Sequence, residues 1–383
     1  MRFGIWMAPL HPVGQNPHLA LHRDLELIEY LDRLGYEEAW IGEHHSAGYE
    51  LVASPEVFIA AAAERTRHIK LGTGVSSLPY HHPLILADRI VLLDHLTRGR
   101  MMFGVGPGAL TSDSYMMGLP TDRARARMEE ALEAILRLFH GERVTMETDW
   151  FVLRDAALQL LPYSDFEIAV AAGISPAGPR AAGRFGLGLL SVGATLNGGV
   201  DMLGAHWSVL EERAAAFQQT VSRSRWRLVG PMHLAETEEQ ARAEVAFGLK
   251  DWLEYFKNIA ALPFAPKADS PDERADAMNE SGIGVIGTPD QAVAQIQRLV
   301  DQSQGGFGTF LLVAHEWANR EATMRSYELF ARYVAPLFQG SAVPPVRSRQ
   351  WVVSQPAFMD AAGAAIVKAI SDHQAEKASS QER

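Results

Sequence analysis

The sequence contains no cysteine in its 383 residues. Disulfide bonds, thiolate metal ligands and cysteine nucleophiles are therefore excluded. Basic residues are also fewer than acidic ones, since 35 Lys and Arg stand against 46 Asp and Glu and give a formal net charge of −11. This balance disfavours nucleic acids and anionic membranes as partners, because both are bound through clustered Lys and Arg.

Long hydrophobic runs are missing as well. No apolar stretch approaches the roughly 20 residues that a membrane-spanning helix needs. The first residues enter a strand-like segment without the pattern of a signal peptide. The expected location is therefore the cytoplasm. The remaining composition, 47% hydrophobic and 21% charged, is that of a globular protein with a large core.

Strand-like and helix-like segments alternate along most of the chain. Strands are predicted at residues 2–8, 37–41, 69–76, 101–105, 166–171, 187–192, 226–234 and 309–314. Helices are predicted at residues 18–34, 57–65, 84–96, 124–139, 176–185, 200–221, 237–256 and 322–334, with an additional one at 289–300. Eight alternating pairs are the pattern of a (β/α)8 TIM barrel, an α/β fold. A doubly wound sheet is the alternative, which the number of elements does not exclude.

Three segments are longer than ordinary connections between such elements. Residues 106–123, 141–165 and 258–284 are predicted to be insertions that form lids or binding loops. The barrel domain is expected to span residues 1–338. Residues 339–383 are expected to form a linker, a C-terminal helix and a polar tail, as an arm that packs on the barrel or on a partner subunit.

Titratable side chains directly follow the predicted strand at 37–41, where Glu43, His44 and His45 stand together. In a barrel the carboxyl ends of the strands form the rim of the active site, so these side chains are candidates for acid–base chemistry. The alternative is a histidine that only hydrogen-bonds a neighbouring loop. His315 opens a second cluster of this kind at the end of the eighth predicted strand.

Residues 104–109 match the dinucleotide fingerprint G-x-G-x-x-G/A. The fingerprint requires a helix to begin at its glycines, but Pro107 interrupts it and residues 110–120 are predicted to be a polar loop. A NAD site is therefore disfavoured. Glycines that let a ligand or the backbone approach closely are the preferred interpretation.

A turn of small residues at 171–176 follows the fifth predicted strand. Ser175 is predicted to cap a helix that starts at Pro176, and the free amides of a helix start bind phosphate. Gly173 removes the side chain that would block this approach. An ordinary capped helix without a ligand is the alternative. Because Arg180 is the first basic residue after the turn, a phosphate here would be held mainly by neutral donors.

No metal site is expected. His81 and His82 follow the third predicted strand and could cap or line the rim, but the first strand ends without the paired ligands of a metallohydrolase barrel. The HExxH motif is also absent from the sequence. A metal-dependent hydrolase is therefore the most remote alternative.

Several short motifs together resemble a known family. They lie at residues 3–5, 43–45, 71–74, 78–79, 82–83, 93–100, 103–106 and 287–289. Their order and spacing resemble those of the bacterial luciferase-like flavin-dependent monooxygenases, and within that family the limonene monooxygenase-type members. The resemblance covers residues 1 to about 338 and rests on the joint pattern, since no single motif carries it.

The resemblance implies a TIM-type barrel that takes reduced FMN (FMNH2) from a separate NAD(P)H-dependent flavin reductase. The reduced flavin would react with O2 to give a C4a-(hydro)peroxyflavin, which oxygenates a small hydrophobic, terpenoid-like molecule. A homodimer is implied as well, since the family commonly dimerises through its barrel helices.

Carried over to this sequence, the resemblance makes His44 the catalytic histidine beside the flavin and places a non-prolyl cis peptide at Gly74-Val75. The residues expected at the cofactor are Ala8, Glu43, Gly74, Val75, Gly106, Ala172, Gly173, Ile174 and Ser175. The residues expected at the substrate are Trp6, Tyr80, Met102, Tyr115 and His315, although plain core packing is an equal alternative for Trp6 and Met102. Pro107 and Gly106 stand where luciferase has a phosphate-contacting arginine and a reactive cysteine. Aldehyde-luciferase activity is therefore not expected, and FMN affinity is expected to be modest.

Two alternative functions share the expected fold. The first is a deazaflavin (F420)-dependent oxidoreductase, which transfers hydride and does not use O2. The second is a flavin-binding accessory protein without turnover.

Overall fold

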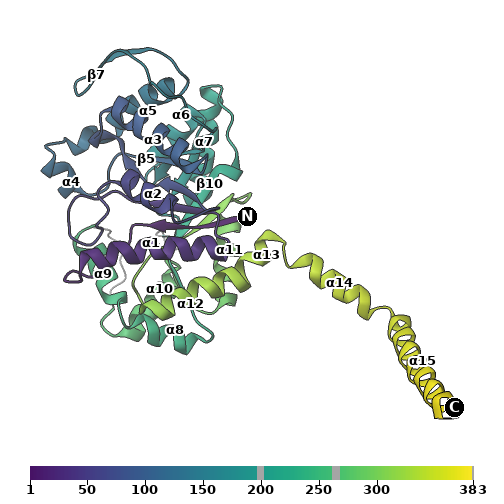
Figure 1. The fold of residues 1–383 in the computed structure, drawn as a ribbon. Coiled ribbons are helices and arrows are strands. Elements are labelled where there is room, and N and C mark those ends of the chain that lie inside the picture. The colour runs from purple at the N-terminus through teal and green to yellow at the C-terminus, as the bar shows by residue number, and fades with distance from the viewer. Residues whose placement is uncertain (196–201, 261–267, 382–383) are drawn as a thin grey trace. The chain divides into compact units, whose positions relative to one another are not determined.

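The computed structural model of the protein describes residues 1–195, 202–260 and 268–381 (Figure 1). Its central feature is a parallel sheet of β1 (Arg2–Met7), β2 (Glu38–Ile41), β3 (Lys70–Thr73), β5 (Met101–Gly106), β8 (Ile168–Ala172), β9 (Gly188–Ser191), β10 (Trp226–Gly230) and β13 (Thr309–Val313). β1 pairs with both β2 and β13, and β3 pairs with β5, so that the sheet closes on itself. The predicted TIM barrel is thereby confirmed.

Helices surround the barrel (Figure 1). They are α1 (Pro17–Leu34), α2 (Pro55–Ala63), α3 (Pro83–Thr97), α5 (Ala124–Phe139), α6 (Ala177–Phe185), α7 (Met202–Ala216), α11 (Pro289–Gln302) and α12 (Arg320–Leu329). Helix α1 shows how the sequence sets their bounds. The Asn16 side chain accepts hydrogen bonds from the first amides, Pro17 fits the first turn, and Gly35 ends the helix with φ of 83°.

The interior of the barrel is apolar in its middle. Its core consists of Trp40, Met102, Ala169, Leu190, Val229, Leu311 and Val313. Gly104 is required here, because a Cβ at this position would lie 2.1 Å from the Thr73 carbonyl oxygen. The packed middle separates the two ends of the barrel.

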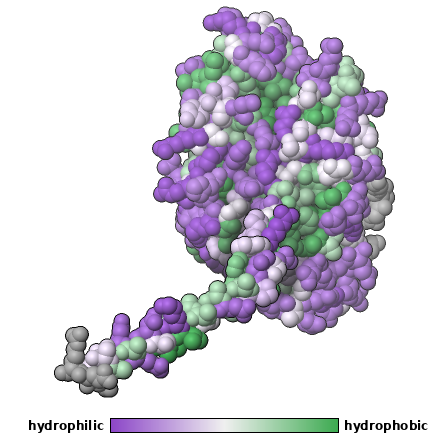
Figure 2. Space-filling view, turned by 90° about the vertical axis from the view of Figure 1, so that its right-hand side faces the viewer, coloured by the Kyte–Doolittle hydropathy of each residue, from purple (hydrophilic) through white to green (hydrophobic). Residues whose placement is uncertain are grey.

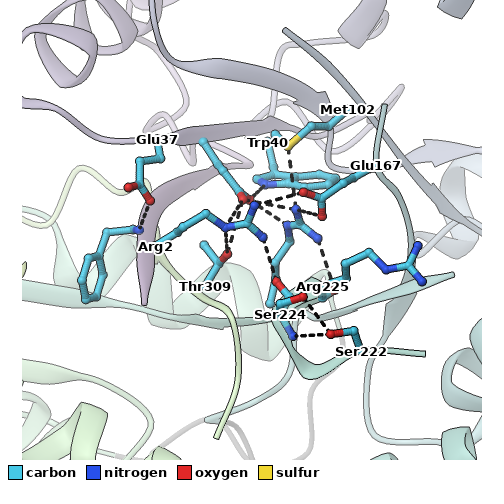
Figure 3. A network of polar contacts seen from close by, with 12 residues as sticks. Arg2, Glu37, Trp40, Met102, Glu167, Ser222, Ser224, Arg225 and Thr309 are labelled. Atoms are coloured by element: carbon cyan, nitrogen blue, oxygen red, sulfur yellow. Dashed lines mark hydrogen bonds and ion pairs between the residues drawn. The ribbon is translucent and has the colours of Figure 1, made fainter. Parts of the chain in front are cut away.

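A charged network fills the amino-terminal end of the barrel (Figure 3). The fully buried Arg227 donates to Glu38 at 2.7 Å and to Glu167 at 2.6 Å, and its guanidinium lies 4.8 Å from the ring centre of Trp40. Burial opposes the charge of Glu167, but Arg227 and Arg2 lower the pKa of that carboxyl to about 2. With this end closed, the carboxyl ends of the strands are left to form a site.

Two predicted elements are divided in the structure. The seventh predicted strand becomes β10 and β11 (Met232–Leu234), separated at Pro231, which has no amide hydrogen for a ladder. β11 pairs instead with β12 (Val285–Gly287), a strand that the sequence did not predict. The predicted helix at 237–256 becomes α8 (Glu238–Val245) and α9 (Leu249–Asn258).

The predicted loops hold more regular structure than expected. The loop predicted at 110–120 contains α4 (Thr111–Met116), and the segment 141–165 contains the antiparallel strands β6 (Val144–Glu147) and β7 (Val152–Ala156). The segment 258–284 contains α10 (Pro271–Ser281), which begins with a capping box between Ser270 and Glu273. Residues 261–267 of that segment lie outside the described part of the chain.

The chain divides into two compact units, Met1–Ala335 and Pro336–Arg383. The second unit contains α14 (Val343–Val353) and α15 (Pro356–Gln381). Where a linker was predicted, Pro344 and Pro345 occupy the first turn of α14, and α15, which includes the predicted C-terminal helix, continues through the predicted polar tail to Gln381. Exposed apolar and polar side chains are mixed along these helices (Figure 2). Within the described ranges, no helix combines the length and the apolar character needed to cross a bilayer.

Candidate active site

A cavity of about 520 Å³ lies at the carboxyl ends of the barrel strands. Strand ends and the segments after them supply much of its wall. These residues are Trp6 near the end of β1, Ala8 and Leu10 after β1, Glu43, His44 and Glu50 after β2, Gly74, Val75 and Ser77 after β3, and Gly173, Ile174 and Ser175 after β8. Helix α9 adds Trp252, Tyr255 and Phe256. The position agrees with the general rule that barrel enzymes place their sites at this end.

The structure brings most of the predicted site residues together. Those that line the cavity are Trp6, Ala8, Glu43, His44, Gly74, Val75, Gly173, Ile174 and Ser175. Gly106 and Ala172 do not line it, and both are buried at the ends of their strands. Gly106 still shapes the wall, because a Cβ there would lie 2.6 Å from Val75 Cγ2. Because Gly106 has no side chain, the Val75 side chain can occupy this position.

Tyr80, Met102 and Tyr115, which were predicted to contact substrate, do not line the cavity. Met102 is fully buried in the barrel core, and the Tyr115 side chain is 87% exposed on α4. The Tyr80 hydroxyl contacts Ser114 at 3.3 Å. The sequence could not reveal the helix that turns Tyr115 outward.

His315, which was also predicted to contact substrate, does not line the cavity. Its Nε2 donates to the Met232 carbonyl at 3.0 Å, its Nδ1 accepts from the Trp317 amide, and its ring stacks on the Trp317 indole. Burial lowers the pKa of His315 to about 3. The ring is therefore a neutral part of the core beside β13.

The His44 imidazole lies between two carboxylates. Its Nε2 is 3.1 Å from Glu50 Oε2, and its Nδ1 is 3.4 Å from Asp113 Oδ2. Burial works against a charged ring, yet the attraction of Glu50 and Asp113 raises the pKa of His44 above its ordinary value. An imidazole in this setting holds a proton at the cavity wall near neutral pH.

Asp113 is the anionic partner in this arrangement. It lies on α4 and accepts hydrogen bonds from the Ser46 hydroxyl at 2.5 Å and from the His45 amide at 3.2 Å. Burial opposes its charge, but hydrogen bonds with His44 and Ser46 lower the pKa of this carboxyl. The short helix α4 thus connects the β5 exit to the β2 exit.

Glu43 joins two strand exits in a similar way. It accepts hydrogen bonds from the Ser77 amide at 2.6 Å, from His81 Nε2 at 2.7 Å and from His45 Nε2 at 3.0 Å. Burial opposes its charge, but the two histidines and the amide hold the pKa of Glu43 below its ordinary value. Its charge is thus already matched by protein groups, although the residue lines the cavity.

The peptide bond between Gly74 and Val75 is cis, as the family resemblance implied. The Trp6 indole Nε1 donates to the Gly74 carbonyl oxygen at 2.6 Å. Gly74 admits no side chain, because a Cβ would lie 2.8 Å from the Cβ of Trp40. These contacts place Val75 on the cavity wall between β3 and β5.

The turn after β8 differs from the prediction in its cap. Helix α6 begins at Ala177 with Pro176 as its N-cap, and no side chain caps it, so the predicted Ser175 cap was wrong. Nothing lies within 4 Å of a Cβ built on Gly173, which leaves the backbone of this turn open to the cavity. The amides at the start of α6 have no capping side chain.

Within the described parts of the chain, Arg125 is the sole lysine or arginine on the cavity wall. It lies in the first turn of α5, and its side chain is exposed. In the sequence it looks like one charge among several on the outer face of an amphipathic helix. Only its position beside the cavity distinguishes it from Arg123 and Arg127, which pair with Asp149.

Residues 1–303 match the family model for luciferase-like monooxygenases. The chain belongs to the luciferase-like monooxygenase family. It is 51% identical to limonene 1,2-monooxygenase of Rhodococcus erythropolis, over 98% of this chain and 97% of that protein. It is 46% identical to 4-hydroxyprotoasukamycin monooxygenase of Streptomyces nodosus subsp. asukaensis, over 92% of this chain and 96% of that protein.

A solved structure of this family shows the same fold with a flavin bound. It is the oxygenating constituent of 3,6-diketocamphane monooxygenase of Pseudomonas putida, a type II Baeyer–Villiger monooxygenase in complex with FMN. The TM-score is 0.72 at 26% identity, covering 88% of this chain and 98% of that chain. The predicted membership of this family and the prediction of a monooxygenase are confirmed.

Three residues of this luciferase-like monooxygenase site escaped prediction. Glu50 and Asp113 lie in connecting segments without a recognisable motif, and Arg125 lies on a helix face that reads as solvated. A signal for Asp113 was present, because an acid in the segment after a barrel strand is a candidate for the rim. The same signal was present for Glu50, which lies in the segment after β2, whereas the sequence offers none for Arg125.

Proposed function

We propose that this protein is a two-component flavin-dependent monooxygenase. It would bind reduced FMN supplied by a separate NAD(P)H-dependent flavin reductase and use O2 to oxygenate a small hydrophobic molecule of terpenoid type. One observation carries the proposal. A single cavity at the barrel rim combines His44, the Gly74-Val75 wall, the open turn at Gly173 and the Arg125 side chain.

The residues of the cavity fit FMN. The volume of the cavity, about 520 Å³, lies within the usual range for small-molecule sites. Gly173 and Ser175 offer backbone at the start of α6, and Arg125 is a cation on the same wall, so both can hold a phosphate. Val75 and Trp6 provide an apolar wall for an aromatic ring.

Bound FMNH2 would supply the electrons that activate O2. The chain would contribute the proton, since His44 is held between Glu50 and Asp113 and favours its charged form. A histidine with this environment can donate a proton or a hydrogen bond near neutral pH. We assign His44 this role.

The chain would also keep water from the reacting atoms. Leu10, Trp252, Phe256 and Ile283 form an apolar part of the cavity wall. Such a wall excludes water, and it favours the binding of a hydrocarbon over that of a polar ligand. This surface supports a hydrophobic substrate, in agreement with the limonene named for the relative from Rhodococcus erythropolis.

Activity reconstitution tests this function. The purified protein is incubated with FMN, NADH, a flavin reductase, O2 and a panel of small terpenes and cyclic ketones, and products are identified by mass spectrometry. We expect a product with one added oxygen atom that requires both the reductase and O2. We expect His44→Asn to lower turnover by about 100-fold while FMN binding persists.

Two outcomes would contradict the proposal. Tight F420 binding with hydride transfer and no oxygenated product would favour the deazaflavin-dependent alternative. FMN binding without turnover of any substrate, unchanged by His44→Asn, would favour an accessory flavin-binding protein. Light scattering in the same experiments tests the expected homodimer.

A further inference from the structure

Glu50 makes a contact through each of its carboxylate oxygens. Its Oε1 accepts a hydrogen bond from the Tyr255 hydroxyl at 2.5 Å, and its Oε2 lies 3.1 Å from His44 Nε2. The residue follows β2, whereas Tyr255 lies on α9, 205 positions further along the chain. Both side chains are buried and both line the cavity.

A buried carboxylate is costly unless its surroundings match it. Glu50 has one neutral donor, the Tyr255 hydroxyl, and one titratable neighbour, the His44 ring. A leucine at this position would be buried at a lower cost in free energy than a carboxylate. The carboxylate lies between Tyr255 and His44, which indicates a role in the arrangement of these two side chains.

We propose that Glu50 is a positioning residue for His44, and that Tyr255 fixes the Glu50 carboxylate in the orientation that this role requires. The ring of His44 lies between two carboxylates, with Glu50 Oε2 3.1 Å from Nε2 and Asp113 Oδ2 3.4 Å from Nδ1. The attraction of these two charges for the ring favours this orientation of its nitrogens. The inference rests on the proposed role of His44 as proton donor.

The charges around the ring support this role. Asp113 and Glu50 face His44 directly, Glu43 adds a more distant negative charge, and Tyr255 faces Glu50. Burial raises the pKa of Glu50, and the nearby Glu50 and Asp113 carboxylates raise that of His44 against the effect of burial. The His44–Glu50 pair therefore retains a proton to higher pH than a free histidine does. Without Glu50, one of the two nearest charges that favour the imidazolium is lost.

The test follows the titration of His44 in the flavin-free protein. The histidines are labelled with ¹³C and ¹⁵N, the His44 signal is assigned with His44→Asn, and its chemical shifts are recorded against pH. In Glu50→Gln the midpoint should move to lower pH. In Tyr255→Phe, which keeps the ring and removes only the hydroxyl, it should move in the same direction by a smaller amount.

Glu56→Gln is the matched control. Glu56 is also a buried carboxylate, in the first turn of α2, but it accepts its hydrogen bond from the Ser54 hydroxyl at 2.7 Å and forms no hydrogen bond or ion pair with His44. We expect the His44 titration of this variant to equal that of the wild type. If Glu50→Gln does not fold, the Tyr255→Phe variant decides the question by itself.

Kinetics give a second readout. In Glu50→Gln, kcat should fall about tenfold with little change in KM, because the proton donor is displaced while the apolar wall is kept. An unchanged His44 titration in both Glu50→Gln and Tyr255→Phe would overturn the inference, as would an equal shift in Glu56→Gln. Because the titration needs no flavin, it decides the role of Glu50 even if no oxygenation is found.

Discussion

At the scale of single residues, Arg125 is recognised as a candidate binding residue only from its position at the cavity wall in the structure. We expect Arg125→Gln to weaken FMN binding about tenfold, since a charge-assisted hydrogen bond contributes about 1.5–3 kcal/mol. Riboflavin, which lacks the phosphate, should bind equally to both proteins. Fluorescence quenching of the two flavins measures the difference.

Arg180→Gln is the control for this experiment. Arg180 is an exposed arginine on α6, outside the cavity wall. Equal losses of FMN affinity in Arg125→Gln and Arg180→Gln would show a general effect of surface charge instead of a phosphate contact.

His11 is a second residue whose environment the sequence did not show. Its buried ring lies 2.7 Å from Glu316 and 2.9 Å from Asp24. Burial opposes the charge, but the two carboxylates raise the pKa of His11 to about 9. The charged ring connects the segment after β1 to the segment after β13.

This environment predicts a pH dependence of stability. The pKa of His11 in the folded protein lies above the ordinary 6.5, so its contribution is complete below about pH 6.5 and is lost as the pH rises through about 9. The loss should be on the order of 3 kcal/mol in the free energy of unfolding. Urea unfolding across this pH range measures it, and His11→Gln should flatten this part of the profile. An equally steep profile in the variant would assign the dependence to other groups.

At the scale of elements, the division between α8 and α9 determines where the outer wall of the cavity lies. The chain turns at Gly248, whose amide donates to the Trp317 carbonyl at 2.9 Å. A Cβ at this glycine would lie 2.0 Å from the Glu316 carbonyl oxygen. The close approach sets the start of α9, and thereby the position of Trp252 and Tyr255.

We therefore expect Gly248→Ala to be destabilising. Moving backbone to relieve such a contact costs about 1–3 kcal/mol, which thermal unfolding would detect as a lower Tm. Gly363 in α15 has open space around its Cβ position, so Gly363→Ala should leave the main transition unchanged. A stability of Gly248→Ala equal to that of the wild type would mean that the α8–α9 turn adapts without cost.

At the scale of the whole molecule, the two ends of the barrel are built differently. The amino-terminal end is filled by the network of Arg227, Glu38, Glu167 and Arg2, while the carboxyl end keeps a cavity. The strands pass through an apolar middle that separates the two regions. In this arrangement the network at the amino-terminal end contributes to stability, and the cavity at the carboxyl end is available for catalysis.

Arg227→Met tests the contribution of the network. Removal of the cation leaves Glu38 buried with less compensation, and loss of one partner of a buried ion pair costs about 3–5 kcal/mol. Denaturant unfolding measures the change. Arg123→Met breaks the exposed pair with Asp149 and should leave stability nearly unchanged, because solvent screens an exposed ion pair. Similar values for the two variants would indicate that the buried network contributes no more than a surface pair.

The sequence predicted the fold well where local patterns repeat. Strands and helices of the barrel are long enough to show their periods, and the Glu43–His44 segment stands where a strand visibly ends. Short elements such as α4 and β12 were missed because three to six residues carry too little pattern. Tyr80 and Tyr115 were assigned to the substrate because an aromatic residue in a long loop does not show which way it points.

What the sequence determined by itself was the alternation of elements and the strand exit that carries His44. What only the tertiary structure decided was which side chains meet there. Glu50 reaches Tyr255 across 205 positions, and the exposed Arg125 lies at the cavity wall, because the barrel closes and brings distant segments to one rim. Periodicity fixes the faces of an element, but contacts between elements depend on how the closed sheet positions them.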